Sequence, residues 1–207
     1  MQTLNSNKKI EVKNDKFISF TPKNQKVEKG FIFYSGAGVE PEAMHQYEEE
    51  IALKGYEVVI AKMPLNLAIL SPNKADKIIS SYNNIKTWAI GGHSLGGVMA
   101  SKYASNHDDI KAVAFYASYP SNDELKDLDL EVLSLYGEKD GVLNKGNLAK
   151  SKENLPSDAK FIEIKGGNHS QFGDYGLQNG DEKASITEEK QFETTANYTI
   201  EVLDKIK

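Results

Sequence analysis

Short apolar runs that alternate with helical patterns constrain the fold of this 207-residue chain more than any other feature. The runs at residues 30–34, 57–63, 87–91, 111–117, 131–136 and 160–164 predict strands. Helical spacing predicts helices near residues 41–55, 75–82, 95–105, 147–155 and 185–206. The run GFIFY at residues 30–34 is continuously apolar, as in a strand buried on both faces. Such alternation builds an α/β fold with a mainly parallel central sheet and helices on both faces.

The N-terminal segment differs in charge from the remainder of the chain. Residues 1–30 hold seven lysines against three acids, although the whole chain has a net charge of −5. We interpret residues 1–29 as a polar, lysine-rich leader with edge strands near residues 11–12 and 16–20. The leader is either solvated or a tether beside an anionic surface. The total length suits one buried core, so we expect a single α/β domain over residues 1–207.

A capping pattern marks the start of the last predicted helix. Ser185 and Glu188 have the spacing of a capping box, in which each side chain bonds a backbone N–H of the other residue. Behind them, Phe192, Ala196 and Leu203 trace one helical face. We therefore expect a long terminal helix with this face against the sheet.

The composition excludes several classes of function. The chain has no cysteine, which rules out disulfides, a thiolate nucleophile and cysteine-ligated metals. The acidic balance and the lack of a basic stripe argue against nucleic acid as a partner. No apolar run approaches the roughly 20 residues of a membrane span. We expect no cofactor, no metal and a cytoplasmic location, or an extracytoplasmic one after removal of an upstream targeting segment; the oligomeric state is open.

The sequence GHSLG at residues 92–96 matches the pattern G-x-S-x-G. A predicted buried strand leads into it and a predicted helix leaves it, which is the setting of a nucleophile elbow. In such a turn the serine adopts a strained conformation with its hydroxyl exposed, and the glycines allow close backbone approach. The alternative is an ordinary glycine-rich turn. We predict that Ser94 is a nucleophile.

A serine nucleophile needs a base, and an elbow of this kind is followed along the chain by an acid and then a histidine. Asp140 lies on the loop after the strand at 131–136, and His169 lies on the loop after the strand at 160–164. Glu138 is the competing acid for the Asp140 role. We predict a catalytic triad of Ser94, Asp140 and His169.

The three remaining histidines are assigned no catalytic role. His45 lies in a predicted helix and His107 lies in a polar loop, so we expect both at the solvated surface. His93 adjoins the nucleophile, and we expect its side chain to point away into the protein packing.

Two backbone N–H groups are expected to form an oxyanion hole. The first belongs to Leu95, directly after the nucleophile, and the second comes from the loop SGAG at residues 35–38. We predict Ala37 as the second donor, with Gly36 as the alternative. No metal is required for this chemistry.

Segments that follow the other strands are candidates for the substrate pocket. Asn66, Tyr119 and Gln178 fall at expected carboxyl ends of strands, where α/β folds open their crevice. The glycine-rich run at residues 172–181 is either a lid, held by Gln178 and Asp181, or plain turn structure. The polar stretch at 119–130 is too short for a large cap domain.

Several motifs together resemble a known family. GGHSLGG, preceded by YSGAGVEPEA and followed by GEKDG and GGNHSQFGDYGLQNGD, resembles a compact bacterial branch of the α/β-hydrolase superfamily over about residues 30–191. The resemblance implies the same roles for Ser94, Asp140 and His169, and an oxyanion loop near residues 36–37. The layout also resembles that of dienelactone hydrolases, but Ser94 stands where those proteins carry cysteine.

These expectations converge on a serine hydrolase. We expect it to cleave a small-molecule ester through an acyl-enzyme intermediate. An acyltransferase or an amidase would use the same triad, and a non-catalytic binding protein with a hydrolase fold is the alternative from another class.

Overall fold

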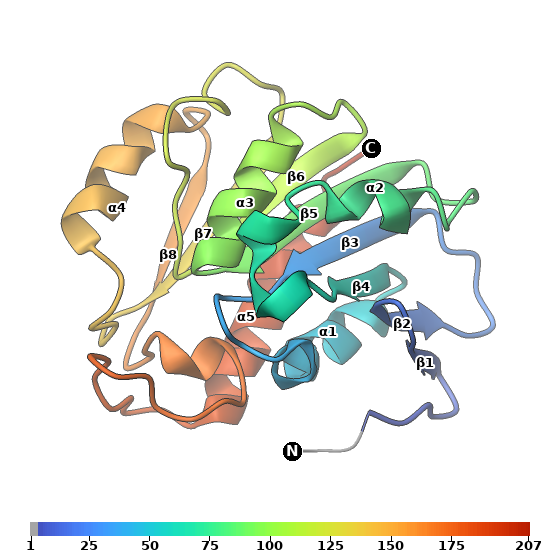
Figure 1. Ribbon diagram of the computed structural model, residues 1–207, viewed down its shortest axis with the longest axis horizontal. Helices are drawn as coiled ribbons and strands as arrows, with labels where there is room; N and C mark the ends of the chain where they lie inside the picture. The colour runs from blue at the N-terminus through green and yellow to red at the C-terminus, as the bar shows by residue number, and fades with distance from the viewer. Residues whose placement is uncertain (1–3) are drawn as a thin grey trace.

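The computed structural model describes residues 4–207 and is built around an eight-stranded sheet with the order β1-β2-β4-β3-β5-β6-β7-β8 (Figure 1). The strands are β1 (Ile10–Asn14), β2 (Ile18–Pro22), β3 (Lys29–Tyr34), β4 (Glu57–Ala61), β5 (Thr87–His93), β6 (Ile110–Tyr116), β7 (Glu131–Gly137) and β8 (Lys160–Ile164). The α-helices are α1 (His45–Ala52), α2 (Lys74–Ile79), α3 (Leu95–Ala104), α4 (Lys145–Ser151) and α5 (Glu188–Leu203). Short 3₁₀ turns are η1 (Pro41–Met44), η2 (Pro64–Asn66), η3 (Ala68–Leu70), η4 (Lys152–Asn154) and η5 (Ser170–Phe172).

The strand order places a topological switch at β3. This strand pairs in parallel with β4 on one side and with β5 on the other, and β6, β7 and β8 extend the parallel part beyond β5. Where successive connections leave a strand in opposite directions, a crevice opens at the carboxyl ends of the strands. The mainly parallel α/β architecture predicted from the sequence is confirmed, and no large cap interrupts it.

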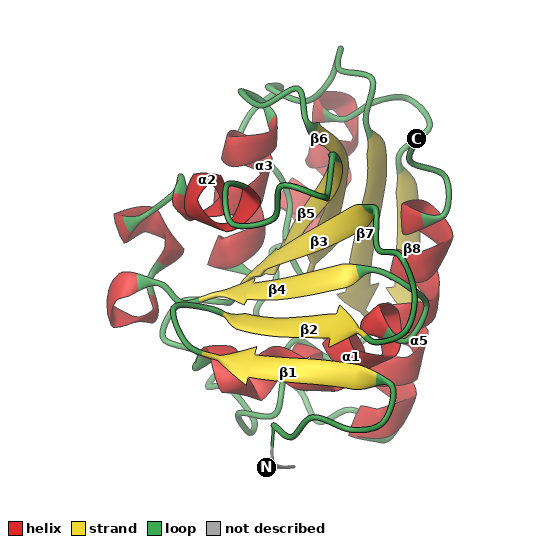
Figure 2. Cartoon of the chain, turned by 90° about the vertical axis from the view of Figure 1, so that its right-hand side faces the viewer, coloured by secondary structure: helices red, strands yellow, loops and turns green. Residues whose placement is uncertain are grey.

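Helices cover both faces of the sheet, which explains why residues 30–34 of β3 are apolar without interruption. Phe31 and Phe33 pack into the cluster that includes side chains of α1 and α5. Ile32 and Tyr34 pack into the opposite cluster, with side chains of α2 and α3. Figure 2 shows these two helical layers on either side of the sheet. Because successive strand residues point to opposite faces, a strand between two layers needs apolar residues at every position.

The N-terminal segment joins the sheet as an antiparallel hairpin. β1 pairs with β2, and β2 pairs antiparallel with β4, with Ile18 opposite Ile60. Ile10, Ile18 and Phe20 are buried in the core. Residues 10–22 therefore belong to the sheet rather than to a solvated leader. This agrees with the edge strands predicted near residues 11–12 and 16–20.

The last helix begins two residues later than the capping-box spacing predicts. Thr187 is the N-cap of α5, and its side chain accepts a hydrogen bond from the backbone N–H of Lys190. Ser185 instead donates its backbone N–H to the Gly166 carbonyl at 2.8 Å. The prediction of a Ser185–Glu188 capping box was wrong because the backbone of residue 185 is bonded to the loop after β8.

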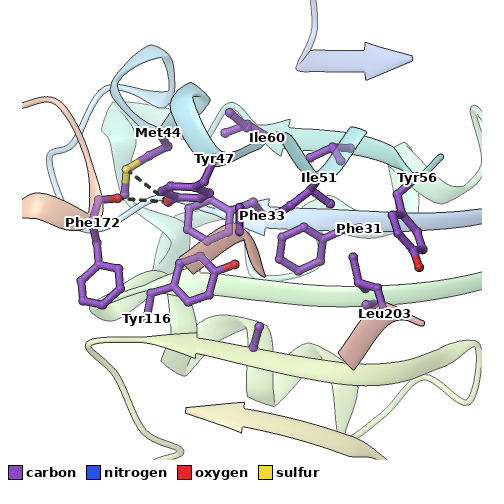
Figure 3. Close-up of a cluster of buried hydrophobic side chains, with 14 of the residues drawn as sticks. Phe31, Phe33, Met44, Tyr47, Ile51, Tyr56, Ile60, Tyr116, Phe172 and Leu203 are labelled. Carbon is purple, nitrogen blue, oxygen red and sulfur yellow. Dashed lines mark hydrogen bonds between the residues drawn. The ribbon is translucent and has the colours of Figure 1, made fainter. Parts of the chain in front are cut away.

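An aromatic cluster links the core to the segment that follows His169. The hydroxyl of Tyr47 in α1 donates to the Phe172 carbonyl at 3.1 Å (Figure 3). The Phe172 ring stacks on Tyr116 of β6, with ring centroids 5.7 Å apart, and Phe33 packs beside Tyr116. Phe172 is fully buried. The turn η5 is thereby attached to the centre of the sheet.

One carboxyl group inside this core has no hydrogen-bond partner in the described part of the chain. Glu48 of α1 is fully buried, and neither of its oxygens has a hydrogen-bond partner among residues 4–207. Burial raises the pKa of Glu48 well above its ordinary value of 4.5. The folded protein therefore holds this group as a neutral acid at pH values where an exposed glutamate is ionised.

We expect Glu48→Gln to stabilise the protein increasingly as the pH rises. Above an unfolded-state pKa of about 4.5, the unfolded chain loses the Glu48 proton that the folded state retains. The free energy of unfolding then falls with pH by up to about 1.4 kcal/mol per unit until the folded group also ionises. The neutral amide does not titrate, so this contribution disappears in the variant. Urea unfolding between about pH 5 and pH 8 measures the difference.

The control for this prediction is Glu153→Gln, at an exposed position of η4. Its free energy of unfolding should run parallel to that of the wild type. Some pH dependence should persist in Glu48→Gln, because burial also raises the pKa of Glu57 to about 7. Parallel curves for wild type and Glu48→Gln over the whole range would contradict the prediction.

Candidate active site

Ser94 lies in a sharp turn between β5 and α3. Its backbone has φ 51° and ψ −122°, a region that an L-residue adopts only under strain. Gly92 and Gly96 make the turn possible. A Cβ on Gly92 would lie 2.4 Å from the Gly96 carbonyl carbon, and one on Gly96 would lie 2.1 Å from the Tyr34 carbonyl oxygen. The local geometry is the strand–turn–helix arrangement that the sequence predicts at this serine.

Neighbouring β6 holds the Ser94 turn from the other side. The backbone N–H of Ser94 donates to the Tyr116 carbonyl at 2.9 Å, and the Ser118 hydroxyl donates to the Ser94 carbonyl at 2.7 Å. Sequence reasoning did not single out Ser118. Its position directly after a predicted parallel strand was the available signal, because the carboxyl ends of such strands meet at one edge.

Asp140 and His169 form a buried pair on adjacent loops after β7 and β8. The Nδ1 atom of His169 lies 2.9 Å from Oδ2 of Asp140, and both side chains are at most 1% exposed. The other carboxylate oxygen of Asp140 accepts the backbone N–H groups of Val142 and Leu143, at 2.9 and 2.7 Å. These bonds orient the carboxylate toward the imidazole, which fixes the ring in turn.

The competing acid lies elsewhere. Glu138 is exposed, accepts the backbone N–H of Gly166 at 2.9 Å and pairs with Lys165 at 3.6 Å. The Gly166 N–H and the Lys165 charge lower the pKa of Glu138. The Glu138 carboxylate therefore binds residues that follow β8, whereas Asp140 contacts His169 directly.

Ser94 and His169 line the same cavity of about 310 Å³. Its other lining residues are Leu95, Val98, Ala117, Ser118, Tyr119, Val142, Leu143 and Asn144. The Nε2 atom of His169 is buried and has no hydrogen-bond partner in the described part of the chain. This nitrogen is therefore available to take a proton, and the bond between nucleophile and base in such sites often tightens only when substrate binds.

The loop after β3 holds both candidates for the second oxyanion donor, and neither the N–H of Gly36 nor that of Ala37 makes a backbone hydrogen bond within residues 4–207. The Gly38 N–H donates to the Asn66 carbonyl at 2.9 Å, so it is already used. Ala37 is exposed, and its N–H makes no backbone hydrogen bond within residues 4–207. Gly36 is buried, and a Cβ there would lie 2.7 Å from His93 Nδ1. Leu95 opens α3, where the first N–H groups of a helix lack intrahelical partners.

Of the three predicted pocket residues, only Tyr119 lines the cavity. Asn66 has a left-handed backbone (φ 54°) and contacts the loop at Gly38 through its carbonyl. Gln178 is exposed, and its backbone N–H donates to the Ser170 hydroxyl at 2.8 Å. The structure thus gives Asn66 and Gln178 loop-holding bonds, and neither residue lines the cavity at Ser94.

The family model of the alpha/beta hydrolases matches residues 30–193. The chain belongs to this family. The match spans the segments that bear Ser94, Asp140 and His169, and it confirms the resemblance to the α/β-hydrolase superfamily. No curated protein matches the chain.

Solved structures share the fold of this alpha/beta hydrolase at low identity. One is Est1E from Butyrivibrio proteoclasticus with ferulic acid bound, at 14% identity and a TM-score of 0.71, covering 95% of this chain and 97% of that one. A predicted CIB-like hydrolase from Thermoplasma acidophilum has 14% identity and a TM-score of 0.67, with 93% and 99% covered. An esterase domain from a Rhodothermus marinus protein has 13% identity and a TM-score of 0.68, with 90% and 92% covered.

The other histidines of this alpha/beta hydrolase differ in part from expectation. His45 is buried, not solvated, because its Nδ1 lies 2.7 Å from the Glu42 carbonyl. His107 is partly exposed and stacks on Tyr103 at 3.7 Å. His93 is buried as expected, yet its ring packs against His169 with centroids 4.6 Å apart. Burial and the neighbouring His169 lower the pKa of His93, so it packs as a neutral ring.

A buried amide also holds the His169 loop. Gln191 of α5 accepts the backbone N–H of Asn168 at 3.1 Å and donates to the Asn168 carbonyl at 2.9 Å. Gln191 is fully buried. Sequence reasoning missed this residue, and a polar side chain beside Phe192 on the buried helical face was the only signal.

The run at residues 172–181 begins in the core and is bonded to the turn η1. Phe172 lies in the core, and the Asp174 N–H donates to the Ala43 carbonyl at 2.7 Å. None of these residues lines the cavity at Ser94. The lid and the turn-structure alternatives for this run therefore both stay predictions.

Residues 4–207 hold neither a metal-ligand cluster nor a membrane-spanning helix. These residues contain no group of three or more histidine, aspartate or glutamate side chains placed to hold a metal ion. No helix in the described part of the chain is long and apolar enough to cross a membrane.

Proposed function

We propose that this alpha/beta hydrolase is a serine hydrolase that cleaves small carboxylic esters through an acyl-enzyme intermediate. The observation that carries the proposal is the buried Asp140–His169 pair beside a cavity that both Ser94 and His169 line. The Nε2 atom of His169 has no hydrogen-bond partner among residues 4–207. A hydroxyl becomes an effective nucleophile when a base removes its proton during attack.

The first half-reaction acylates the serine. The Ser94 hydroxyl oxygen attacks the ester carbonyl carbon while Nε2 of His169 takes the hydroxyl proton. Asp140 holds the Nδ1–H tautomer and stabilises the imidazolium that forms. The N–H groups of Ala37 and Leu95 bind the oxyanion, and each such donor contributes about 3 kcal/mol. The imidazolium then gives its proton to the leaving alcohol.

The second half-reaction releases the acid. His169 takes a proton from water, the resulting hydroxide attacks the acyl carbon, and the proton returns to the Ser94 oxygen as the ester bond breaks. The esterase neighbours support an ester substrate, since the fold is shared with an esterase domain and with Est1E. Amide cleavage and acyl transfer would use the same residues, and they serve as comparison reactions in the test.

The cavity supports a small acyl group. Val98, Val142 and Leu143 supply apolar surface, and the cavity volume is about 310 Å³. The stretch between β6 and β7 adds no lid, because Leu125 is buried in the core. Each methylene that the cavity covers contributes about 0.8 kcal/mol, and methylenes beyond it contribute nothing.

We expect kcat/KM to be highest for acetyl to butyryl esters. Decanoyl and longer esters should show no higher kcat/KM than these short ones. A series of p-nitrophenyl esters of increasing chain length measures this directly. The amides of the same short acids, and hydrolysis with an added alcohol acceptor, are run beside it. A maximum at ten or more carbons would contradict the size prediction. If the protein cleaves the amides but not the esters, amide cleavage replaces ester cleavage as its reaction.

A further inference from the structure

The carboxylate of Asp181 connects the loops that carry Asp140 and His169. Its Oδ1 accepts the backbone N–H of Gly141 at 3.0 Å and that of His169 at 3.3 Å. Its Oδ2 accepts the backbone N–H and the hydroxyl of Ser170, at 2.8 and 2.6 Å. Gly141 directly follows Asp140, whereas His169 and Ser170 lie after β8. We call Asp181, Gly141, His169 and Ser170 the Asp181 clamp.

The clamp carries a negative charge at neutral pH. Burial raises the pKa of Asp181, but the hydrogen bonds from Ser170, Gly141 and His169 outweigh burial and lower the pKa below its ordinary value of 3.8. Hydrogen bonds to an ionised acceptor are about twice as strong as neutral ones. The carboxylate can therefore hold both loops at once, which a neutral side chain of the same size would do less well.

The loops have little room to move away from this carboxylate. A Cβ on Gly141 would lie 2.4 Å from the Gly180 carbonyl oxygen, so the backbone before Asp181 packs directly on the Asp140 loop. Backbone bonds from Glu138 to Ile164 and from Lys139 to Gly167 join the two loops nearer the strands. The Asp181 clamp is the connection at the level of Asp140 and His169 themselves.

We propose that Asp181 is a positioning residue, which holds the Asp140 and His169 loops at the separation that their 2.9 Å contact requires. This inference rests on the proposed function of Ser94, Asp140 and His169. Asp181 does not line the cavity, so it acts through these residues without touching substrate. Its loss should reduce kcat, whereas KM, which depends on the cavity walls, should change little.

The test is Asp181→Asn, which keeps the size of the side chain but replaces one acceptor oxygen by an NH₂ group. That group cannot accept an N–H, so one side of the clamp is lost whichever way the amide points. A displacement of about 1 Å in a catalytic group costs on the order of 10²-fold in rate, so we expect kcat to fall about 10²-fold. The rate of fluorophosphonate labelling at Ser94 should fall in parallel, and KM should stay within about twofold of wild type.

The matched control is Asp158→Asn, which removes the same charge at an exposed position before β8 and should keep the wild-type kcat. Circular dichroism and urea unfolding establish whether each variant is folded. Should Asp181→Asn not fold, Ser170→Ala carries the test. This variant removes one of the five hydrogen bonds that Asp181 accepts, together with the hydroxyl that accepts the Gln178 N–H. One hydrogen bond of about 1 kcal/mol corresponds to about a fivefold loss in kcat.

A folded Asp181→Asn variant with kcat within twofold of wild type would overturn the proposal. An increase in KM that accounts for the whole loss in kcat/KM would also overturn it, as would wild-type kcat in Ser170→Ala when Asp181→Asn is unfolded. Failure of the proposed function has a separate signature, because ester hydrolysis would then be absent from the wild type or would persist in Ser94→Ala.

Discussion

Ser94→Ala should lower kcat for the preferred short ester by about 10⁶-fold, the loss typical of removing the serine of such a triad. The methyl group cannot attack the carbonyl, so only binding and the oxyanion donors still act on the substrate. We expect the variant to fold as the wild type does, because its contacts to Tyr116 and Ser118 are made by the backbone of residue 94. Steady-state kinetics and urea unfolding measure the two quantities.

Covalent labelling gives an independent measure of the same prediction. A fluorophosphonate probe should add to wild-type protein at Ser94 and should not add to Ser94→Ala, since an unactivated hydroxyl reacts slowly. Ser118 is the internal control, because its hydroxyl lines the same cavity but donates to the Ser94 carbonyl. Peptide mapping that places the label on Ser118, or undiminished hydrolysis by Ser94→Ala, would contradict Ser94 as the nucleophile.

Asp140→Asn should lower kcat by about 10⁴-fold, with the fold intact. The carboxylate accepts the Nδ1–H of His169 at 2.9 Å, and this bond selects the tautomer whose Nε2 is unprotonated. An amide NH₂ at the same place would donate to Nδ1 and favour the tautomer that carries its proton on Nε2. The base could then no longer take the proton of Ser94. The ratio of kcat values for variant and wild type measures the effect.

The matched control is Glu138→Gln, two residues earlier on the same loop. Glu138 contacts Gly166 and Lys165 rather than the histidine, so its amide should keep kcat within a few-fold of wild type. A large loss in Glu138→Gln together with a small loss in Asp140→Asn would identify Glu138 as the acid of the triad.

The sequence was most informative where the local pattern and the fold make the same demand. The run GFIFY has apolar residues for both faces of β3, and both faces are in fact covered by helices. The segment GHSLG could be placed between a strand and a helix because its glycines stand where the turn brings backbone segments close together. For the same reason the loops after β7 and β8 could be expected to lie side by side, since parallel neighbours end at one edge of the sheet.

Contacts between segments far apart in the chain were decided by the tertiary structure alone. No spacing predicts that Gln191 bonds the backbone of Asn168, that Asp181 spans two loops, or that Glu48 is buried without a hydrogen-bond partner among residues 4–207. Helical and strand periodicity report only which side of an element faces the core. Whether a polar group on that side meets a donor, a carboxylate or nothing depends on how distant loops pack together. For that reason the candidate triad could be read from the sequence, but the groups that hold it in place could not.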